Sequence, residues 1–137
     1  MKVTSVYKKC HCEEGEARRS NLLKSYMISN LTRNTVIASN VEIAQTSQSR
    51  MKGLLGTKEL AFGKALIITH CQSIHMFFMN YPIDVIFCDQ QNKVVGLCVE
   101  IKPFQLSPLF FKASYAIELP TGTITTSQTQ IGDQVQI

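Results

Sequence analysis

The sequence contains no long hydrophobic run. No segment approaches the roughly 18 to 20 consecutive apolar residues that a membrane-spanning helix requires. The N-terminus is basic, with Lys2, Lys8 and Lys9, but the apolar core of a secretory signal does not follow it. These absences predict a protein that neither crosses a membrane nor is exported, and we expect it in the cytoplasm.

Paired metal-ligand motifs are also missing. Cys10, His11 and Cys12 are adjacent, but zinc sites normally use two separated ligand pairs, and the sequence has no second pair. The cysteine count is five, an odd number without a repeated spacing, which argues against a disulfide framework. We therefore expect free thiols, as suits a reducing compartment, and neither a metal ion nor another cofactor.

Recognisable catalytic motifs are absent as well. The sequence has no phosphate-binding loop, dinucleotide-binding glycine motif, G-x-S-x-G or H-E-x-x-H. Residues 27–137 carry eight basic and seven acidic side chains, so their charge gives no reason to expect binding to nucleic acid. The sequence leaves open whether the protein is an enzyme, which residues would be catalytic, and how many copies assemble.

The chain divides into two parts of different character. At 137 residues it has room for one domain with a single core. Residues 1–26 have few apolar side chains, and between Glu13 and Lys24 acidic residues precede basic ones, an order that suits a marginal helix. We predict a weakly ordered or marginally helical N-terminal extension over residues 1–26 and a single mainly β domain over residues 27–137.

Short β-type runs make up most of the predicted domain. Strands at their spacing are typical of an antiparallel β-sandwich or a partly closed, jelly-roll-like barrel, and we expect one of these two. The runs, separated by turn residues, span residues 35–44, 65–69, 73–78, 83–88, 94–101, 115–119 and 134–137.

One short α-helix is expected near residues 47–55. The polar cluster before it offers an N-cap at Thr46 or Ser47, and Gly56 can end the helix in a left-handed conformation. Its predicted apolar face consists of Met51, Leu54 and Leu55.

Two polar residues interrupt hydrophobic runs. His75 lies within residues 73–78 and Asp84 within residues 83–88, where an unpaired carboxylate would be costly. If residues 80–81 form a two-residue hairpin loop, His75 and Asp84 are diagonal neighbours on one face, roughly 7–8 Å apart at the backbone. One interpretation is an imidazole oriented by a carboxylate in a pocket. The other, which we favour, is that Asp84 accepts hydrogen bonds that fix the turn.

Arg50, Glu118 and Cys71 have simpler interpretations. Arg50, on the predicted helix, could contact an anion, although arginines more often face solvent. Glu118 lies on the strand face opposite Ile117 and is expected to be exposed. Cys71 and His75 would be about 13 Å apart in a continuous strand, so they can act as nucleophile and base only if the chain bends sharply between them.

The order of short motifs resembles a known family. Over about residues 30–137 it is similar to the bacterial and archaeal family called domain of unknown function 192. The resemblance implies a compact, mainly β fold of sandwich or jelly-roll type and no established activity. The motifs are Arg50-x-x-Gly53-Leu54-x-Gly56, Ser73-Ile74-His75-x-Phe77-Phe78-Met79, Pro82-Ile83-Asp84-Val85-Ile86-Phe87, Glu118-Leu119-Pro120-x-Gly122 and Gly132-Asp133.

The resemblance also marks candidate ligand-binding positions. The family often has threonine after the motif histidine and a basic residue after the motif methionine, whereas Met76 and Asn80 stand there, which weakens a polar site around the turn. The motif residues that are not plain core are Arg50, His75, Asp84 and Glu118.

Three classes of function remain. The leading one is a module that binds a small molecule or peptide in a pocket near His75 and Asp84. The second is a hydrolase or transferase that uses the same residues. The third is a structural or interaction protein without a small-molecule site. An open concavity with converging polar groups would favour the first two.

Overall fold

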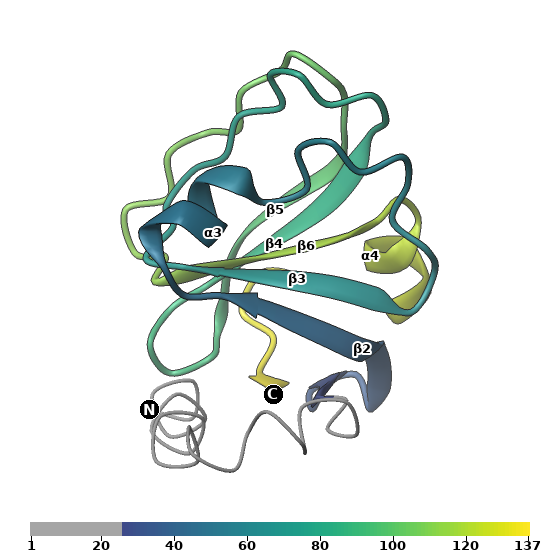
Figure 1. Ribbon diagram of the computed structural model, residues 1–137. Coiled ribbons are helices and arrows are strands. Elements are labelled where there is room, and N and C mark those ends of the chain that lie inside the picture. Colours follow the sequence, from purple (N-terminus) through teal and green to yellow (C-terminus); the bar gives the residue numbers. More distant parts are fainter. Residues whose placement is uncertain (1–25) are drawn as a thin grey trace, which may run out of the picture.

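The computed structural model describes residues 26–137 (Figure 1). The predicted extension over residues 1–26 lies outside the described residues, apart from Tyr26, which begins the first strand. The strands are β1 (Tyr26–Asn30), β2 (Thr35–Ala44), β3 (Lys64–Thr69), β4 (Ile83–Cys88), β5 (Val94–Ile101), β6 (Tyr115–Pro120) and β7 (Val135–Gln136), and the helices are α3 (Ser47–Lys52) and α4 (Thr123–Ser127).

The strands form one curled sheet in the order β5-β4-β6-β3-β2-β1-β7. All neighbours are antiparallel except β2 and β3, which run parallel. The two ends of the sheet meet where Lys93 bridges to Gln134 and the Val94 N–H donates to the Asp133 carbonyl oxygen at 2.9 Å. The mainly β prediction is therefore confirmed, and of the two expected architectures the chain forms the partly closed barrel.

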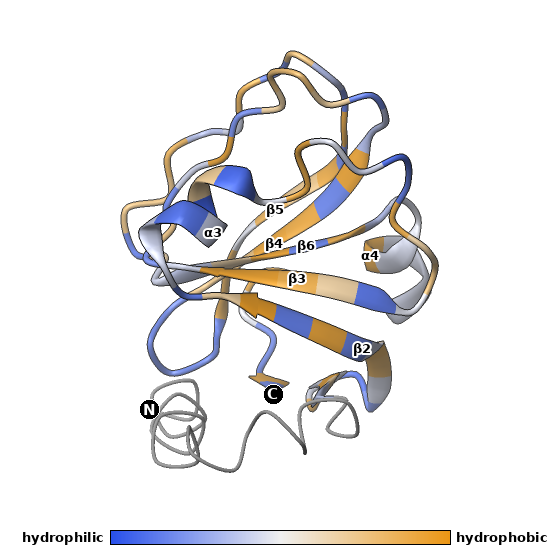
Figure 2. Ribbon diagram, in the orientation of Figure 1, coloured by the Kyte–Doolittle hydropathy of each residue, from blue (hydrophilic) through white to orange (hydrophobic). Residues whose placement is uncertain are grey.

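The central strands are covered on both faces. Every residue of β4 and β6 is buried, and β3 is exposed only at Lys64. In Figure 2, β3 is hydrophobic along most of its length, whereas β2 alternates between polar and apolar residues. One apolar cluster, which includes Ile67 and Ile117, joins all seven strands and α4. The other, which includes Val85 and Phe87, packs against Leu54 and the loops after β3 and β5, on the side where α3 lies (Figure 1).

Helix α3 forms where predicted but ends earlier. At its N-terminus the Thr46 hydroxyl accepts from the Ser49 N–H and the Ser49 hydroxyl accepts from the Thr46 N–H, both at 3.0 Å. The helix ends at Lys52 and its C-cap is Gly53, whose φ of 47° and ψ of −126° suit glycine, and not Gly56. Met51 is 79% exposed, so the predicted apolar face is wrong at that position.

Residues 73–78 do not form the predicted hairpin with β4. Strands β5 and β6 occupy both edges of β4, because a strand that is apolar on both faces takes a central place in the sheet. Residues 73–78 lie instead beside the loop after β5. There His75 bridges to Leu106, and the Met76 N–H donates to the Gln105 carbonyl oxygen at 2.8 Å.

Helix α4 is not anticipated by the sequence. Its residues include three threonines, which are poor helix formers, and show no apolar helical period. It follows Gly122, which has a left-handed φ of 89° and supplies no side-chain cap. Its position therefore depends on contacts with the sheet.

Candidate functional site

Glu118 lies in the middle of the sheet. On β6 it pairs with Leu66 of β3 and Val85 of β4, two apolar neighbours. The residue is only 7% exposed, and burial raises the pKa of its carboxyl from 4.5 to about 7. The prediction that Glu118 is exposed is wrong, because the face opposite Ile117 is covered as well.

Arg50 reaches the same region from α3. Its Nη1 donates to the Thr69 carbonyl oxygen at 3.3 Å, at the end of β3. The helix thereby holds the guanidinium against the sheet. Arg50 was expected to face solvent, but its side chain is partly buried.

A cavity of about 110 Å³ lies between α3, the sheet and the loop after β3. Arg50, His75 and Glu118 line it, so the structure brings together three of the four candidate residues. Within residues 26–137, three buried side-chain nitrogen or oxygen atoms lack a hydrogen-bond partner, and two of them, Arg50 Nε and Glu118 Oε2, belong to this lining. Such atoms are rare and costly in folded proteins.

Arg50 and Glu118 do not satisfy each other. In the described part of the chain, Arg33 and Asp133 form an ion pair at 3.2 Å, whereas no nitrogen of Arg50 lies within 4.0 Å of an oxygen of Glu118. The cavity is therefore lined by a guanidinium and a carboxyl group that do not pair with each other.

A tight turn over residues 76–79 supplies the apolar wall. The Met79 N–H donates to the Met76 carbonyl oxygen at 3.3 Å, and Phe78 has a φ of 65°, in the left-handed region. The turn buries Met76 and Met79, which line the cavity, and leaves Phe77 and Phe78 exposed.

Cys71 and His75 both line the cavity but do not form a nucleophile and its base. The chain bends after β3, as that pairing would require. The Cys71 thiol nevertheless donates to the Ser73 carbonyl oxygen at 3.2 Å, and burial, together with the charge of Glu118, raises its pKa to about 11. His75 is exposed, and its ring stacks on Phe77 with 5.2 Å between centroids.

Asp84 holds the fold together and does not line the cavity. Its Oδ1 accepts from the Glu100 N–H at 2.8 Å, and its Oδ2 accepts from the Ile124 N–H at 3.0 Å. The predicted pairing of His75 with Asp84 is wrong, because the hairpin that would create it does not form. The favoured interpretation, that Asp84 accepts structural hydrogen bonds, agrees with the structure. The bonds differ from the expected ones, because they fix α4 and β5 and not the turn before β4.

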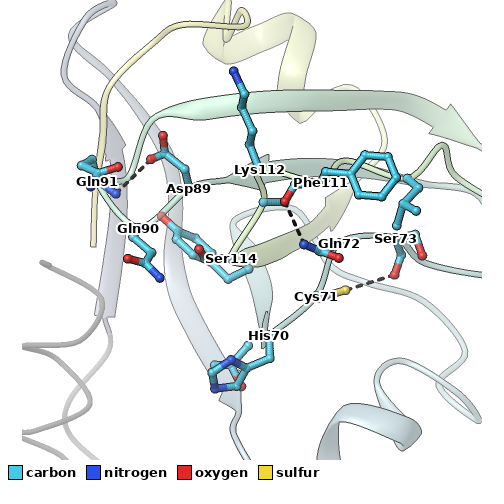
Figure 3. A pocket seen from close by; sticks show the side chains of 14 residues that line it. His70, Cys71, Gln72, Ser73, Asp89, Gln90, Gln91, Phe111, Lys112 and Ser114 are labelled. Atoms are coloured by element: carbon cyan, nitrogen blue, oxygen red, sulfur yellow. Dashed lines mark hydrogen bonds between the residues drawn. The ribbon is translucent and has the colours of Figure 1, made fainter.

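A wider hollow of about 1170 Å³ adjoins the cavity and shares Cys71 and Ser73 with it. Figure 3 shows its polar side chains spread around the space, with His70 and Lys112 at opposite ends of the view. Several of these groups have protein partners. Gln72 Nε2 donates to the Phe111 carbonyl oxygen at 2.8 Å, and Asp89 Oδ1 accepts from the Gln91 N–H at 2.9 Å. The smaller cavity is therefore the stronger candidate.

Residues 26–137 contain neither a cluster of metal ligands nor a membrane-spanning helix. No group of three or more histidine, cysteine, aspartate or glutamate side chains there could hold a metal ion. None of the helices in this range is long and apolar enough to cross a membrane. Cys10, His11 and Cys12 lie outside the described residues.

Comparison with known proteins places the chain in a family. The family model DUF192, described as "Uncharacterized ACR", matches residues 29–137. The chain belongs to this family. The family resemblance inferred from the motif order is confirmed, and the family has no established function.

Two archaeal members are similar over 113 residues, or 80% of this chain, and both are named UPF0127 protein. The protein of Thermococcus sibiricus is 35% identical over 73% of its own length. The protein of Pyrococcus horikoshii is 34% identical over 97% of its length.

Two solved structures share the fold. A protein of unknown function from Novosphingobium aromaticivorans superposes with a TM-score of 0.71 and 21% identity, over 81% of this chain and 82% of its own. A Sinorhizobium meliloti protein, named as a candidate transcription regulator, gives a TM-score of 0.66 and 17% identity, over 82% and 95%. At these identities the likeness concerns the fold alone.

Proposed function

We propose that this DUF192 protein binds a small molecule in the cavity lined by Arg50, His75 and Glu118. The observation that carries the proposal is the presence of two buried, unpartnered polar atoms, Arg50 Nε and Glu118 Oε2, beside one cavity. A ligand that accepts from Arg50 and donates to Glu118 would satisfy both. The volume of about 110 Å³ favours a small molecule over a peptide.

Catalysis at this cavity has less support than binding. A carboxyl with a pKa of about 7, such as that of Glu118, is suited to acid–base chemistry at neutral pH. The cavity offers no activated nucleophile beside it, because the pKa of the Cys71 thiol is raised to about 11. We therefore assign the residues to binding.

We also propose a cytoplasmic location and a partner other than nucleic acid or membrane. In the described range, Cys71, Cys88 and Cys98 are free thiols, which suits a reducing compartment. The near balance of acidic and basic residues over 27–137 supports a small partner.

The test is a thermal-shift screen of metabolites and metal salts against the full chain and three variants. We expect a compound that raises the Tm of the wild type and of the matched control Glu42→Gln, where the glutamate is exposed. The same compound should not raise the Tm of Glu118→Gln or Arg50→Lys. Hits that stabilise all four proteins equally, or a broad screen without a hit, would contradict the proposal.

A further inference from the structure

The cavity is lined by a guanidinium and a carboxyl group that come from separate elements and do not meet. The guanidinium of Arg50 is held by α3, and the carboxyl of Glu118 projects from β6. Breaking or omitting one partner of a buried charged pair leaves the other uncompensated, which is strongly unfavourable. A ligand with a single charge would therefore satisfy one wall of the cavity and leave the other wall unpaired.

The size and remaining lining of the cavity restrict the ligand further. At about 110 Å³ the cavity is smaller than the roughly 300–1,000 Å³ of pockets for drug-sized ligands, so it suits a ligand of few atoms. Ile68, Met76 and Met79 contribute apolar surface to the lining, and Lys52, Ser73 and His75 contribute polar groups. The apolar part of the wall suits a hydrogen atom or a methyl group.

We infer that the ligand is a small zwitterion, an α-amino acid of the size of glycine or alanine, an assignment that rests on the proposed function of the cavity. Its carboxylate accepts from Arg50 Nε, and its ammonium group donates to Glu118 Oε2. Any methyl group lies against Met76 and Met79. Each of the two unpartnered protein atoms thereby gains a charge-assisted hydrogen bond.

The ionisable groups around the cavity suit this assignment. Arg50 and Lys52 of α3 line the cavity together with Glu118, as do Cys71 and His75 of the loop after β3. In the empty cavity burial favours the protonated form of Glu118, and an ammonium group beside it would favour the ionised form. The ligand therefore displaces a proton from Glu118 as it binds.

The experiment compares five probes by isothermal titration with the full chain at pH 8. Glycine and L-alanine carry both charges, whereas acetate and methylamine each carry one. L-Phenylalanine keeps the same charged groups but has a side chain too large for the cavity. We expect glycine or L-alanine to bind at least tenfold more tightly than the other three, since each lost charge-assisted hydrogen bond costs that much or more.

Two variants separate this assignment from the proposed function. Glu118→Gln should weaken glycine binding at least tenfold and leave acetate binding unchanged. Arg50→Met should also weaken glycine binding at least tenfold, but it should leave methylamine binding unchanged. Acetate or methylamine binding as tightly as glycine would overturn the zwitterion while the small-molecule function stands. The zwitterion is also overturned, and the small-molecule function stands, if neither amino acid binds but another compound from the thermal-shift screen binds the wild type and not Glu118→Gln. If no compound binds at all, the proposed function itself fails.

Discussion

The carboxylate of Asp84 on β4 accepts a hydrogen bond from the backbone N–H of Ile124, 40 residues later in the chain, at 3.0 Å. Its other oxygen accepts from the Glu100 N–H at 2.8 Å, where Glu100 interrupts β5 with a φ of 53°. One buried side chain thus caps α4, whose own N-cap residue, Gly122, has no side chain to do so. Asp84 connects the sheet to both features.

Asp84→Asn should destabilise the protein. An asparagine offers one acceptor oxygen and turns an N–H₂ group toward a second backbone N–H, so one of the two charge-assisted bonds is lost. We expect a loss of about 1.5–3 kcal/mol in the free energy of unfolding, measured by urea denaturation.

The same variant tests the separation of Asp84 from His75. In a double-mutant cycle with His75→Ala, the two effects should add to within about 0.5 kcal/mol. A coupling above 1 kcal/mol would mean that the two side chains meet after all.

Stability should fall as the pH rises from about 4.5 to 7, because of Glu118. The folded protein holds the Glu118 proton up to a pKa of about 7, whereas the unfolded chain releases it near 4.5. The folded state therefore binds more protons in this window, and the free energy of unfolding decreases with pH by up to roughly 3 kcal/mol.

Glu118→Gln should remove this dependence and be more stable than the wild type at pH 8. Urea denaturation at pH 5 and pH 8 measures both effects. The exposed Glu42→Gln serves as control and should keep the wild-type pH profile. Identical profiles for Glu118→Gln and wild type would show that Glu118 ionises normally in the fold.

Gly53→Ala should cost about 1–3 kcal/mol, because a φ of 47° with a ψ of −126° is a region that only glycine enters easily. Space is not the reason: an added Cβ would lie 3.8 Å from Ile68 Cδ1, an ordinary contact. Gln48→Ala, at an exposed position of α3, provides the comparison and should be close to neutral. Equal stabilities of the two variants would argue against this backbone conformation.

Gly96→Ala should destabilise for a steric reason. A Cβ at Gly96 would stand 2.4 Å from the ring of Phe110, which packs on Phe87 with 4.6 Å between centroids. We expect a cost of about 1–3 kcal/mol in urea denaturation. In the Phe110→Leu background the same change should cost less, so the two substitutions should not add. If the stability losses of Gly96→Ala and Phe110→Leu simply add, the Phe110 ring does not lie against Gly96.

The strands could be predicted from the sequence where β-branched and other apolar residues are dense, whether the apolar run is continuous, as in β4, or alternates with polar residues, as in β2. The runs at residues 35–44, 83–88 and 94–101 coincide with β2, β4 and β5. Residues 73–78 show the limit of this reasoning. Their apolar pattern arises from Ile74 and Met76, which pack in the core cluster beside the loop after β5, and a local pattern does not distinguish that from a strand.

The candidate site could be predicted only in part. The family resemblance marks Arg50, His75 and Glu118, which meet at the cavity, but it also marks Asp84, whose role is structural. Strand alternation indicates that Glu118 faces away from Ile117, yet it cannot indicate that α3 and a loop cover that second face. Burial of Glu118 is a tertiary property, set by Leu66 and Val85 on the neighbouring strands.

The most direct test of the cavity as a ligand site is methyl NMR of the full chain with labelled methionines. Met76 and Met79 line the cavity, whereas Met27 is 53% exposed on β1 and serves as an internal control. Addition of glycine, or of any compound found by the thermal-shift screen, should move the Met76 and Met79 methyl signals saturably and leave Met27 unchanged, and Glu118→Gln should abolish the shifts. Signals of Met76 and Met79 that stay in place while the compound binds would contradict the account.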